Sequence, residues 1–351
     1  MSEDRCDRCN ESLACGHSYC VKCGRPLGYV AGASSKADEK SSGLSGIIRM
    51  VGVIVLLMCV PFLFFEVFTM FWVMDGIISN IGDYLIPILF LTPSPIALGY
   101  IHGIVAQSYY IFLVVAVLVS FIIIMYDSRE GLKELFESKI NKVTETPIYA
   151  VVTLFAATIA FNIILNMFLV ASGNEPKVPD IWDDPNYEPW MLHYDLLNAS
   201  VWEEVLCRVL MIGLPLMLLG VMRTDKAAWK RLFGRFEMDR AAVILIIVSS
   251  AIFAYAHMGG WDALKIIPTF VTGLALGYLF VKYGVHAAIM LHFLVDYSSA
   301  PIWVFGDDMG EPMVLLFILG VVFFGAALFV WYLIRSVRFT RDMVSKPQHR
   351  P

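Results

Sequence analysis

The chain has 351 residues, of which 58% are hydrophobic and only 16% are charged, whereas an ordinary soluble domain contains about 25% charged residues. With a mean hydropathy of +0.69, this composition excludes a soluble protein and predicts one that crosses a membrane several times. The formal net charge of -5 says little as a total, because the positions of the charges decide how such a protein lies in the bilayer.

The first 26 residues form a separate, cysteine-rich segment. Cys6 and Cys9, then Cys20 and Cys23, make two pairs with two residues between the members of each pair, which is the spacing of a tetrahedral zinc site. The segment resembles the small zinc ribbons that precede many prokaryotic membrane proteins. We predict one structural zinc ion here, with two disulfides as the alternative that a cytosolic location disfavours.

The remainder of the amino-terminal region contains no apolar run of the kind that directs export, so we expect this end of the chain to stay in the cytoplasm. Residues 27–46 are rich in Gly, Ser, Ala and Lys and are expected to form a flexible linker. Acidic and basic residues are nearly balanced in the ribbon, which predicts no nucleic-acid contact. A protein partner or a stabilising cap are its two remaining roles.

Residues 47–336 are expected to form the membrane domain, because they contain eight apolar runs that are each long enough to cross the hydrocarbon core as a helix. The predicted fold class is therefore all-α, a polytopic bundle of about eight transmembrane helices. The predicted spans are 47–72, 104–126, 148–171, 197–221, 241–258, 263–283, 284–300 and 313–335. The segment 84–102 contains Pro87, Pro93 and Pro95 and is expected to be re-entrant or interfacial.

The loops between these spans differ in charge. Lys and Arg gather at 127–147, at 222–240 and in the tail 337–351, whereas Asp and Glu dominate 172–195 and 301–312. Basic loops lie on the cytoplasmic side of a membrane. We therefore predict an integral, multi-pass membrane protein with both termini in the cytoplasm.

Few charged residues fall inside the spans, and an intramembrane charge costs at least about 2.5 kcal/mol. Glu204 and Arg208 are four residues apart, so they share a helical face and can neutralise each other. Glu203 points about 100° away and must find partners on other helices or water in a cavity. Glu66 is expected at the outer interface, where a carboxylate is tolerated.

Such partners for Glu203 exist on two later spans. His257 ends the fifth span, and His292 and Asp296 lie on one face of the seventh, about 6 Å apart along the helix axis. One buried histidine is usually a core residue. Two histidines and two carboxylates on three spans instead favour a shared catalytic site.

These residues form three motifs: EExxxR at 203–208, FxxxH at 253–257 and HxxxD at 292–296. In this order, they resemble the CPBP family (CAAX-processing and bacteriocin-processing proteins, also called ABI), eight-span intramembrane proteases that include the type II CAAX prenyl endopeptidases. The likeness covers residues 195–300.

The resemblance implies that Glu203 is the base that activates water, with help from His257. It also implies that His292 and Asp296 hold the nucleophile or the oxyanion. Glu204 and Arg208 are then expected to contact and orient these catalytic residues without touching the substrate. Gly273 and Gly277 are expected to permit close helix packing.

Position 296 leaves the mechanism open. Asn stands there in the family members that best fit a metal-free scheme, and Asn can donate a hydrogen bond to an oxyanion, whereas Asp must be protonated to do so. In the alternative, Glu203, His257, His292 and Asp296 bind a catalytic Zn²⁺. Family likeness favours chemistry without a metal.

The function that we expect is an intramembrane endopeptidase that hydrolyses a peptide bond of a membrane-associated protein or peptide. The alternatives are a non-catalytic bacteriocin-immunity or binding protein of the same fold, and a proton-coupled transporter that uses Glu203 and Glu66 as a relay.

Overall fold

A computed structural model describes residues 36–92, 94–137, 140–180 and 184–345. The predicted zinc ribbon and its four cysteines lie outside the described residues. The chain divides into two compact units, Met1–Ile47 and Ile48–Pro351, and the fold below is that of the second unit.

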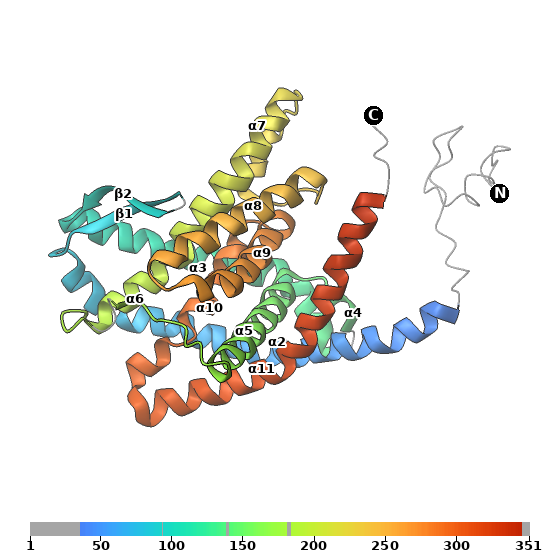
Figure 1. Cartoon of the computed structure of the whole chain (residues 1–351), viewed down its shortest axis with the longest axis horizontal. Helices are drawn as coiled ribbons and strands as arrows, with labels where there is room; N and C mark the ends of the chain where they lie inside the picture. Colours follow the sequence, from blue (N-terminus) through green and yellow to red (C-terminus); the bar gives the residue numbers. More distant parts are fainter. Residues whose placement is uncertain (1–35, 93, 138–139, 181–183, 346–351) are drawn as a thin grey trace. The chain divides into compact units, whose positions relative to one another are not determined.

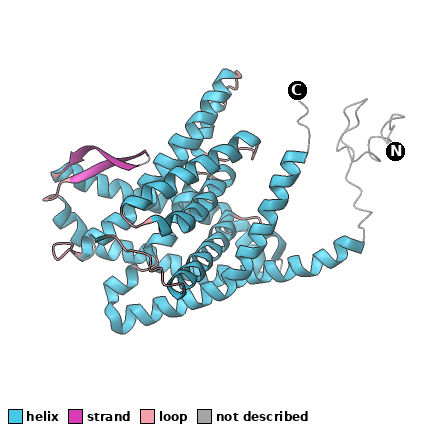
Figure 2. Cartoon of the chain, viewed as in Figure 1, coloured by secondary structure: helices cyan, strands magenta, loops and turns pink. Residues whose placement is uncertain are grey.

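The membrane domain is built almost entirely of helices (Figures 1 and 2), which confirms the predicted class. The main helices are α2 (Lys36–Ile81), α3 (Gly103–Phe136), α5 (Pro147–Ala171), α6 (Pro189–Asn198), α7 (Leu214–Met222), α8 (Arg240–Ala256), α9 (Ile266–Tyr283), α10 (Val285–Tyr297) and α11 (Ala300–Ser345). Shorter turns are α4 (Ile140–Val143), η2 (Ala199–Glu203), η3 (Val205–Gly213), η4 (Ala228–Phe233), η5 (His257–Gly259) and η6 (Ala263–Lys265).

The described helices include seven that are long and apolar enough to span a membrane. An eighth arises if α10 and Ala300–Gly306, bent by 43°, count as one span. Gly306 has φ of +70° inside α11, a backbone conformation that glycine adopts without strain, and it separates this short arm from the rest of the helix. The prediction of about eight spans is confirmed.

Two segments differ from what the sequence predicts. α2 begins at Lys36, so the second half of the expected linker is helical. The proline-rich segment, predicted to be re-entrant or interfacial, forms an antiparallel hairpin of β1 (Ile86–Thr92) and β2 (Ser94–Ile101). Its prolines prevent a helix, whereas strand edges tolerate proline.

The core of the domain centres on α10 and α5. Residues 286–294 of α10 and 147–160 of α5 are all buried, because α10 packs against α3, α5 and α9, and α5 packs against α11. A Cβ at Gly277 of α9 would lie 2.8 Å from Ile246 of α8, and one at Gly273 would lie 3.0 Å from Ser250. The prediction that these glycines permit close packing is confirmed.

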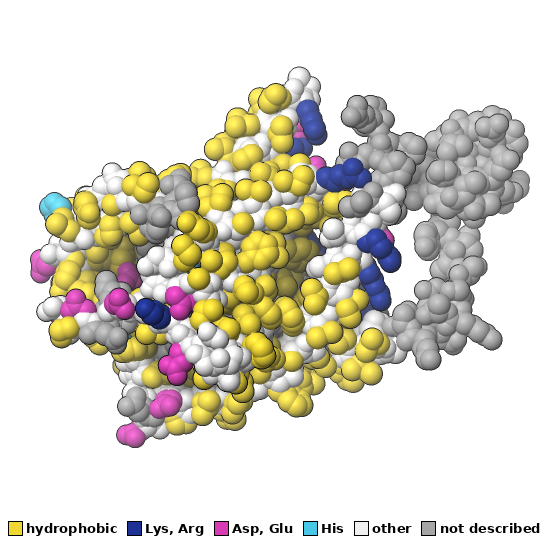
Figure 3. Space-filling model, in the orientation of Figure 1, with side chains coloured by type: hydrophobic (Ala, Val, Ile, Leu, Met, Phe, Trp, Pro, Cys, Tyr) yellow, Lys and Arg dark blue, Asp and Glu magenta, His cyan; other side chains and the backbone are white. Residues whose placement is uncertain are grey.

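The charged side chains gather at opposite ends of the domain. In Figure 3 the acidic side chains cluster on the side of α6 and the hairpin, and Lys and Arg cluster at the other end, beyond a broad apolar surface. This separation is what an integral membrane protein requires. The assignment of the basic end to the cytoplasm stays a prediction.

Candidate active site

The fourth predicted span has an unusual backbone. Between α6 and α7 the chain forms the π-helical turns η2 and η3, which meet at Glu203 and Glu204. π-Helical turns are rare and occur often at functional sites. Ser249 of α8 donates its hydroxyl to the Cys207 carbonyl over 2.6 Å, so a neighbouring helix supplies a donor to this widened turn.

Glu203 faces two histidines from other helices, as the sequence predicts. Its Oε2 lies 3.8 Å from Nε2 of His257 and 3.8 Å from Nε2 of His292. The side chain is 19% exposed, although Oε2 itself is buried and has no hydrogen-bond partner among the described residues. A separation of 3.8 Å is too long for a direct hydrogen bond, and a water molecule that lies to one side of the pair can contact both atoms.

The protonation of His257 follows from its own helix. Nδ1 lies 2.8 Å from the Phe253 carbonyl, and because a carbonyl only accepts, Nδ1 carries the proton. In the neutral ring Nε2 then has a free lone pair directed at Glu203. Phe253 also packs edge-on against this ring, with centroids 4.7 Å apart, which holds the imidazole in place.

His292 lies between carboxylates. Its Nδ1 is 2.9 Å from Oε1 of Glu204, and its Nε2 is 3.2 Å from Oδ2 of Asp296. Ionised carboxylates only accept hydrogen bonds, so a ring that donates from both nitrogens satisfies both neighbours. The contact between His292 and Asp296 follows from the spacing of four residues that the sequence shows, whereas the contact with Glu204 is one that sequence analysis missed.

Glu204 and Arg208 form the predicted pair within one helix. Nε of Arg208 lies 3.2 Å from Oε2 of Glu204, and both side chains are completely buried. The Phe253 ring covers the guanidinium at 5.0 Å, and Ser249 accepts a hydrogen bond from it over 3.3 Å. Through Glu204, this buried pair contacts and orients His292.

Lys265 is a further charged residue near the cluster that sequence analysis missed. It interacts electrostatically with Asp296 and lies 3.7 Å from the centre of the Trp261 ring. The signal was present, since Lys265 is a lone cation at the start of a span. Its relation to Asp296 depends on the packing of α9 against α10, which sequence spacing does not reveal.

The loop that follows His257 is anchored to the acidic loop before α6. Asp262 accepts backbone hydrogen bonds from Lys177 at 2.9 Å and from Leu264 at 2.7 Å. The Lys177 amide is the main cause that holds the pKa of the Asp262 carboxyl below its usual range. This contact holds the loop after His257 against the acidic loop that precedes α6.

The catalytic Zn²⁺ that the sequence left open as an alternative stays a prediction. Within the described part of the chain, no group of three or more His, Cys, Asp or Glu side chains is placed to hold one. Nδ1 of His257 contacts a backbone carbonyl and Nδ1 of His292 contacts Glu204, so the Nε2 atoms are the ones that face Glu203, and Nε2 of His292 also contacts Asp296. The arrangement therefore offers one free imidazole lone pair, that of His257 Nε2.

Glu66, which the sequence predicted at the outer interface, is completely buried inside the domain, and its depth in the membrane stays a prediction. Neither of its carboxylate oxygens has a hydrogen-bond partner among the described residues, and the same holds for the hydroxyls of Tyr110 and Tyr297. Tyr297 interacts electrostatically with both. These three side chains form a second buried polar group that does not include Glu203.

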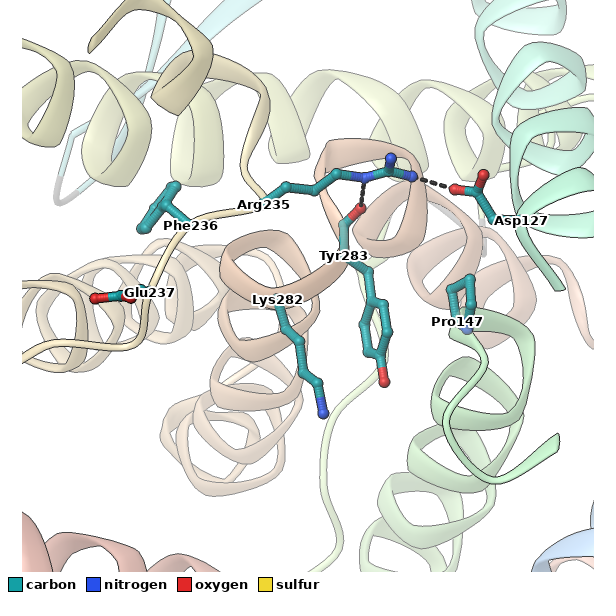
Figure 4. A pocket seen from close by; sticks show the side chains of 7 residues that line it. All are labelled: Asp127, Pro147, Arg235, Phe236, Glu237, Lys282 and Tyr283. Carbon is teal, nitrogen blue, oxygen red and sulfur yellow. Dashed lines mark hydrogen bonds and ion pairs between the residues drawn. The ribbon is translucent and has the colours of Figure 1, made fainter. Parts of the chain in front are cut away.

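A surface pocket lies elsewhere. It has a volume of about 490 Å³, and its lining residues are Asp127, Pro147, Arg235, Phe236, Glu237, Lys282 and Tyr283 (Figure 4). Arg235 donates to the Tyr283 carbonyl at 2.7 Å and pairs with Asp127. None of the residues that surround Glu203 lines this pocket, so it is separate from the candidate active site.

Comparison with known proteins matches the segment that contains the three motifs to one family model. Residues 185–298, about a third of the chain, match the family model of the type II CAAX prenyl endopeptidase Rce1-like proteins. No curated protein and no solved structure matches the chain. The matched segment contains all three motifs and supports a peptidase, in a chain whose apolar helices make it an integral membrane protein.

Proposed function

We propose that the protein is an intramembrane endopeptidase that hydrolyses a peptide bond of a membrane-associated protein or peptide, using water activated by Glu203. One observation carries this proposal: two acceptors, the Glu203 carboxylate and Nε2 of His257, face each other across 3.8 Å. A water molecule has two donor hydrogens and can satisfy both acceptors at once. Its oxygen lone pairs then point away from both, toward a substrate carbonyl.

In this proposal the chemistry proceeds by general base catalysis. Glu203 takes a proton as the water oxygen attacks the peptide carbonyl, and it returns that proton to the leaving amine. His292, with protons on both nitrogens, provides positive charge beside the developing oxyanion. Glu204 and Asp296 hold that ring in place through its two nitrogens.

The test compares membranes that contain the wild-type protein with membranes that contain the Glu203→Gln variant. The peptides released from each are identified by mass spectrometry. A peptide released by wild type alone is the expected result. Glu66→Gln is the matched control, because it makes the same change at a fully buried glutamate outside the cluster and should leave cleavage intact. Cleavage by Glu203→Gln at the wild-type rate would overturn the mechanism.

The alternatives give different patterns in the same experiment. A non-catalytic immunity or binding protein would release no peptide from wild type either, while partner binding would survive Glu203→Gln. A proton relay through both buried glutamates would be impaired equally by Glu66→Gln and Glu203→Gln. The cluster around Glu203 favours hydrolysis, because it places a base and a free imidazole lone pair 3.8 Å apart, close enough for one water molecule to donate to both.

The amino-terminal zinc ribbon belongs to the proposal as well. Purified protein should contain about one zinc ion per chain, and Cys6→Ser with Cys20→Ser should remove it. Activity on a small peptide should survive this change, because the proposed chemistry uses no ribbon residue. Zinc that persists in the double variant and is lost on His257→Ala would instead favour the catalytic metal.

A further inference from the structure

The β hairpin is an uncharged, two-stranded sheet in a domain whose other described elements are helices. Residues 86–101 contain no Asp, Glu, Lys or Arg. Ile96, Leu98 and Tyr100 of β2 are each more than half exposed. A sheet of two strands also has two open edges, each with unpaired backbone N–H and C=O groups.

The register shows which backbone groups of β1 point outward. Pro87 pairs with Tyr100, and Leu91 pairs with Pro95, and because proline has no N–H these two pairs cannot be hydrogen-bonded ones. The pairing shifts between Ile88 and Leu89, where Leu98 of β2 has no partner in β1, but the extra residue lies on β2, so bonded and non-bonded positions still alternate along β1. Leu89 therefore also points its N–H and C=O away from β2, in line with Pro87 and Leu91.

This outer edge of β1 faces the candidate active site. The indole Nε1 of Trp202 donates to the Leu89 carbonyl over 2.6 Å, and Trp202 immediately precedes Glu203. β1 also packs against η3 and against α8, and His257 is the first residue after α8. No other described residue makes a hydrogen bond to the outward groups of β1.

An open apolar edge in this position has a physical cost, since backbone groups without partners are unfavourable where water is scarce. An added strand removes that cost through main-chain hydrogen bonds, and alternate side chains then provide specificity. A peptide bond is also accessible to a nucleophile only where the substrate backbone is extended, because a helix encloses its carbonyls.

We propose that the outer edge of β1 binds an extended, uncharged segment of the substrate as a third strand and so presents its peptide bond to Glu203. This inference rests on the proposed function and adds how the substrate is recognised. The apolar faces of the hairpin favour an apolar peptide. The contact between Trp202 and Leu89 makes the binding edge continuous with the catalytic cluster.

The test uses the uncleaving variant Glu203→Gln in lipid nanodiscs. The probe is a lipid-anchored synthetic peptide of about ten uncharged residues, mainly Val, Thr and Leu. N-Methylation of one backbone amide at a time removes one donor. Methylation at alternate residues should weaken binding about threefold to tenfold, the loss of one net hydrogen bond, and the intervening positions should have no effect.

A protein variant provides the reciprocal measurement. Leu89→Pro removes the outward N–H of β1, whereas Leu89→Ala retains it and removes only the side chain. Leu89→Pro should weaken binding by the same factor, because one peptide carbonyl loses its donor, and it should leave the effect of methylation in place, because the carbonyls of β1 that accept from the peptide are retained. Leu89→Ala should retain the full alternating pattern.

Each outcome bears on a different claim. No peptide binding, equal sensitivity at every position, or a period of three to four residues would overturn strand addition. The peptide scan uses an unaltered hairpin, so it decides the matter even if Leu89→Pro fails to fold. Alternating sensitivity in a peptide that wild type never cleaves would support strand addition and overturn the proposed endopeptidase.

Discussion

His292 is the residue that joins the parts of the cluster. It contacts Glu204 through Nδ1, Asp296 through Nε2, and lies 3.8 Å from Glu203. Oε2 of Glu203, which faces both histidines, is buried without a hydrogen-bond partner among the described residues. The carboxylates thus divide into two that orient a histidine and one that is free to act on water.

Asp296→Asn separates the two mechanisms that the sequence left open. An Asn amide can donate to an oxyanion and still accept from Nε2 of His292, so we expect the rate of peptide release to stay within about threefold of wild type. A metal site would lose a carboxylate ligand and most of its activity. Peptide release and bound metal, measured on the same preparation, check this prediction.

Glu204→Gln should lower the stability of the protein as well as its rate of peptide release. The change leaves Arg208 buried without a counter-ion, and a buried pair that loses one partner costs about 3–5 kcal/mol. Thermal unfolding in detergent should show a lower midpoint than wild type.

The double variant Glu204→Gln/Arg208→Met provides the control, because it removes both charges. Its unfolding midpoint should recover at least in part. An unchanged midpoint in Glu204→Gln alone would show that this pair does not support the site.

At the scale of elements, the π-helical turns depend on α8. Ser249→Ala removes the donor to the Cys207 carbonyl and a contact of Arg208, so it should cost about 1–3 kcal/mol of stability. Ser250→Ala is the matched control, since Ser250 bonds only to Ile246 in its own helix. Equal unfolding midpoints for the two variants would contradict this role of Ser249.

The sequence predicts some of these elements and not others, for physical reasons. Span positions follow from the length of apolar runs, and the contact of Glu204 with Arg208 follows from helical spacing. The π-helical turns were not predictable, because they arise where η3 meets Ser249 of another helix. The hairpin was missed because an apolar, proline-rich segment identifies a break in helix but not the pairing of two strands.

The burial of Glu66 shows the same limit. Its distance along the chain suggested the end of a span, but α2 continues to Ile81 and places Glu66 in the middle of a long helix. Contacts between distant segments put Tyr110 and Tyr297 beside it. Hydropathy predicts where a span lies along the chain, but it does not predict which other segments pack against that span.

At the scale of the whole domain, the separation of charge sets the expected direction of the active site. Glu203 is the fifteenth residue of the helical span Pro189–Met222, which follows the acidic loop 172–188, and the loop after His257 is anchored to the same acidic loop through Asp262. If the basic loops are cytoplasmic, the cluster lies in the outer half of the membrane. Its substrates would then be exported or membrane-embedded.

Cysteine labelling tests this orientation. In a background without native cysteines, Glu175→Cys in the acidic loop should react with a membrane-impermeant maleimide in intact cells, and Lys230→Cys in a basic loop should react only after permeabilisation. Both positions are exposed, so access to the reagent depends on the side of the membrane. The reverse pattern would place Glu203 near the cytoplasm, where prenylated cytosolic proteins become the more reasonable substrates.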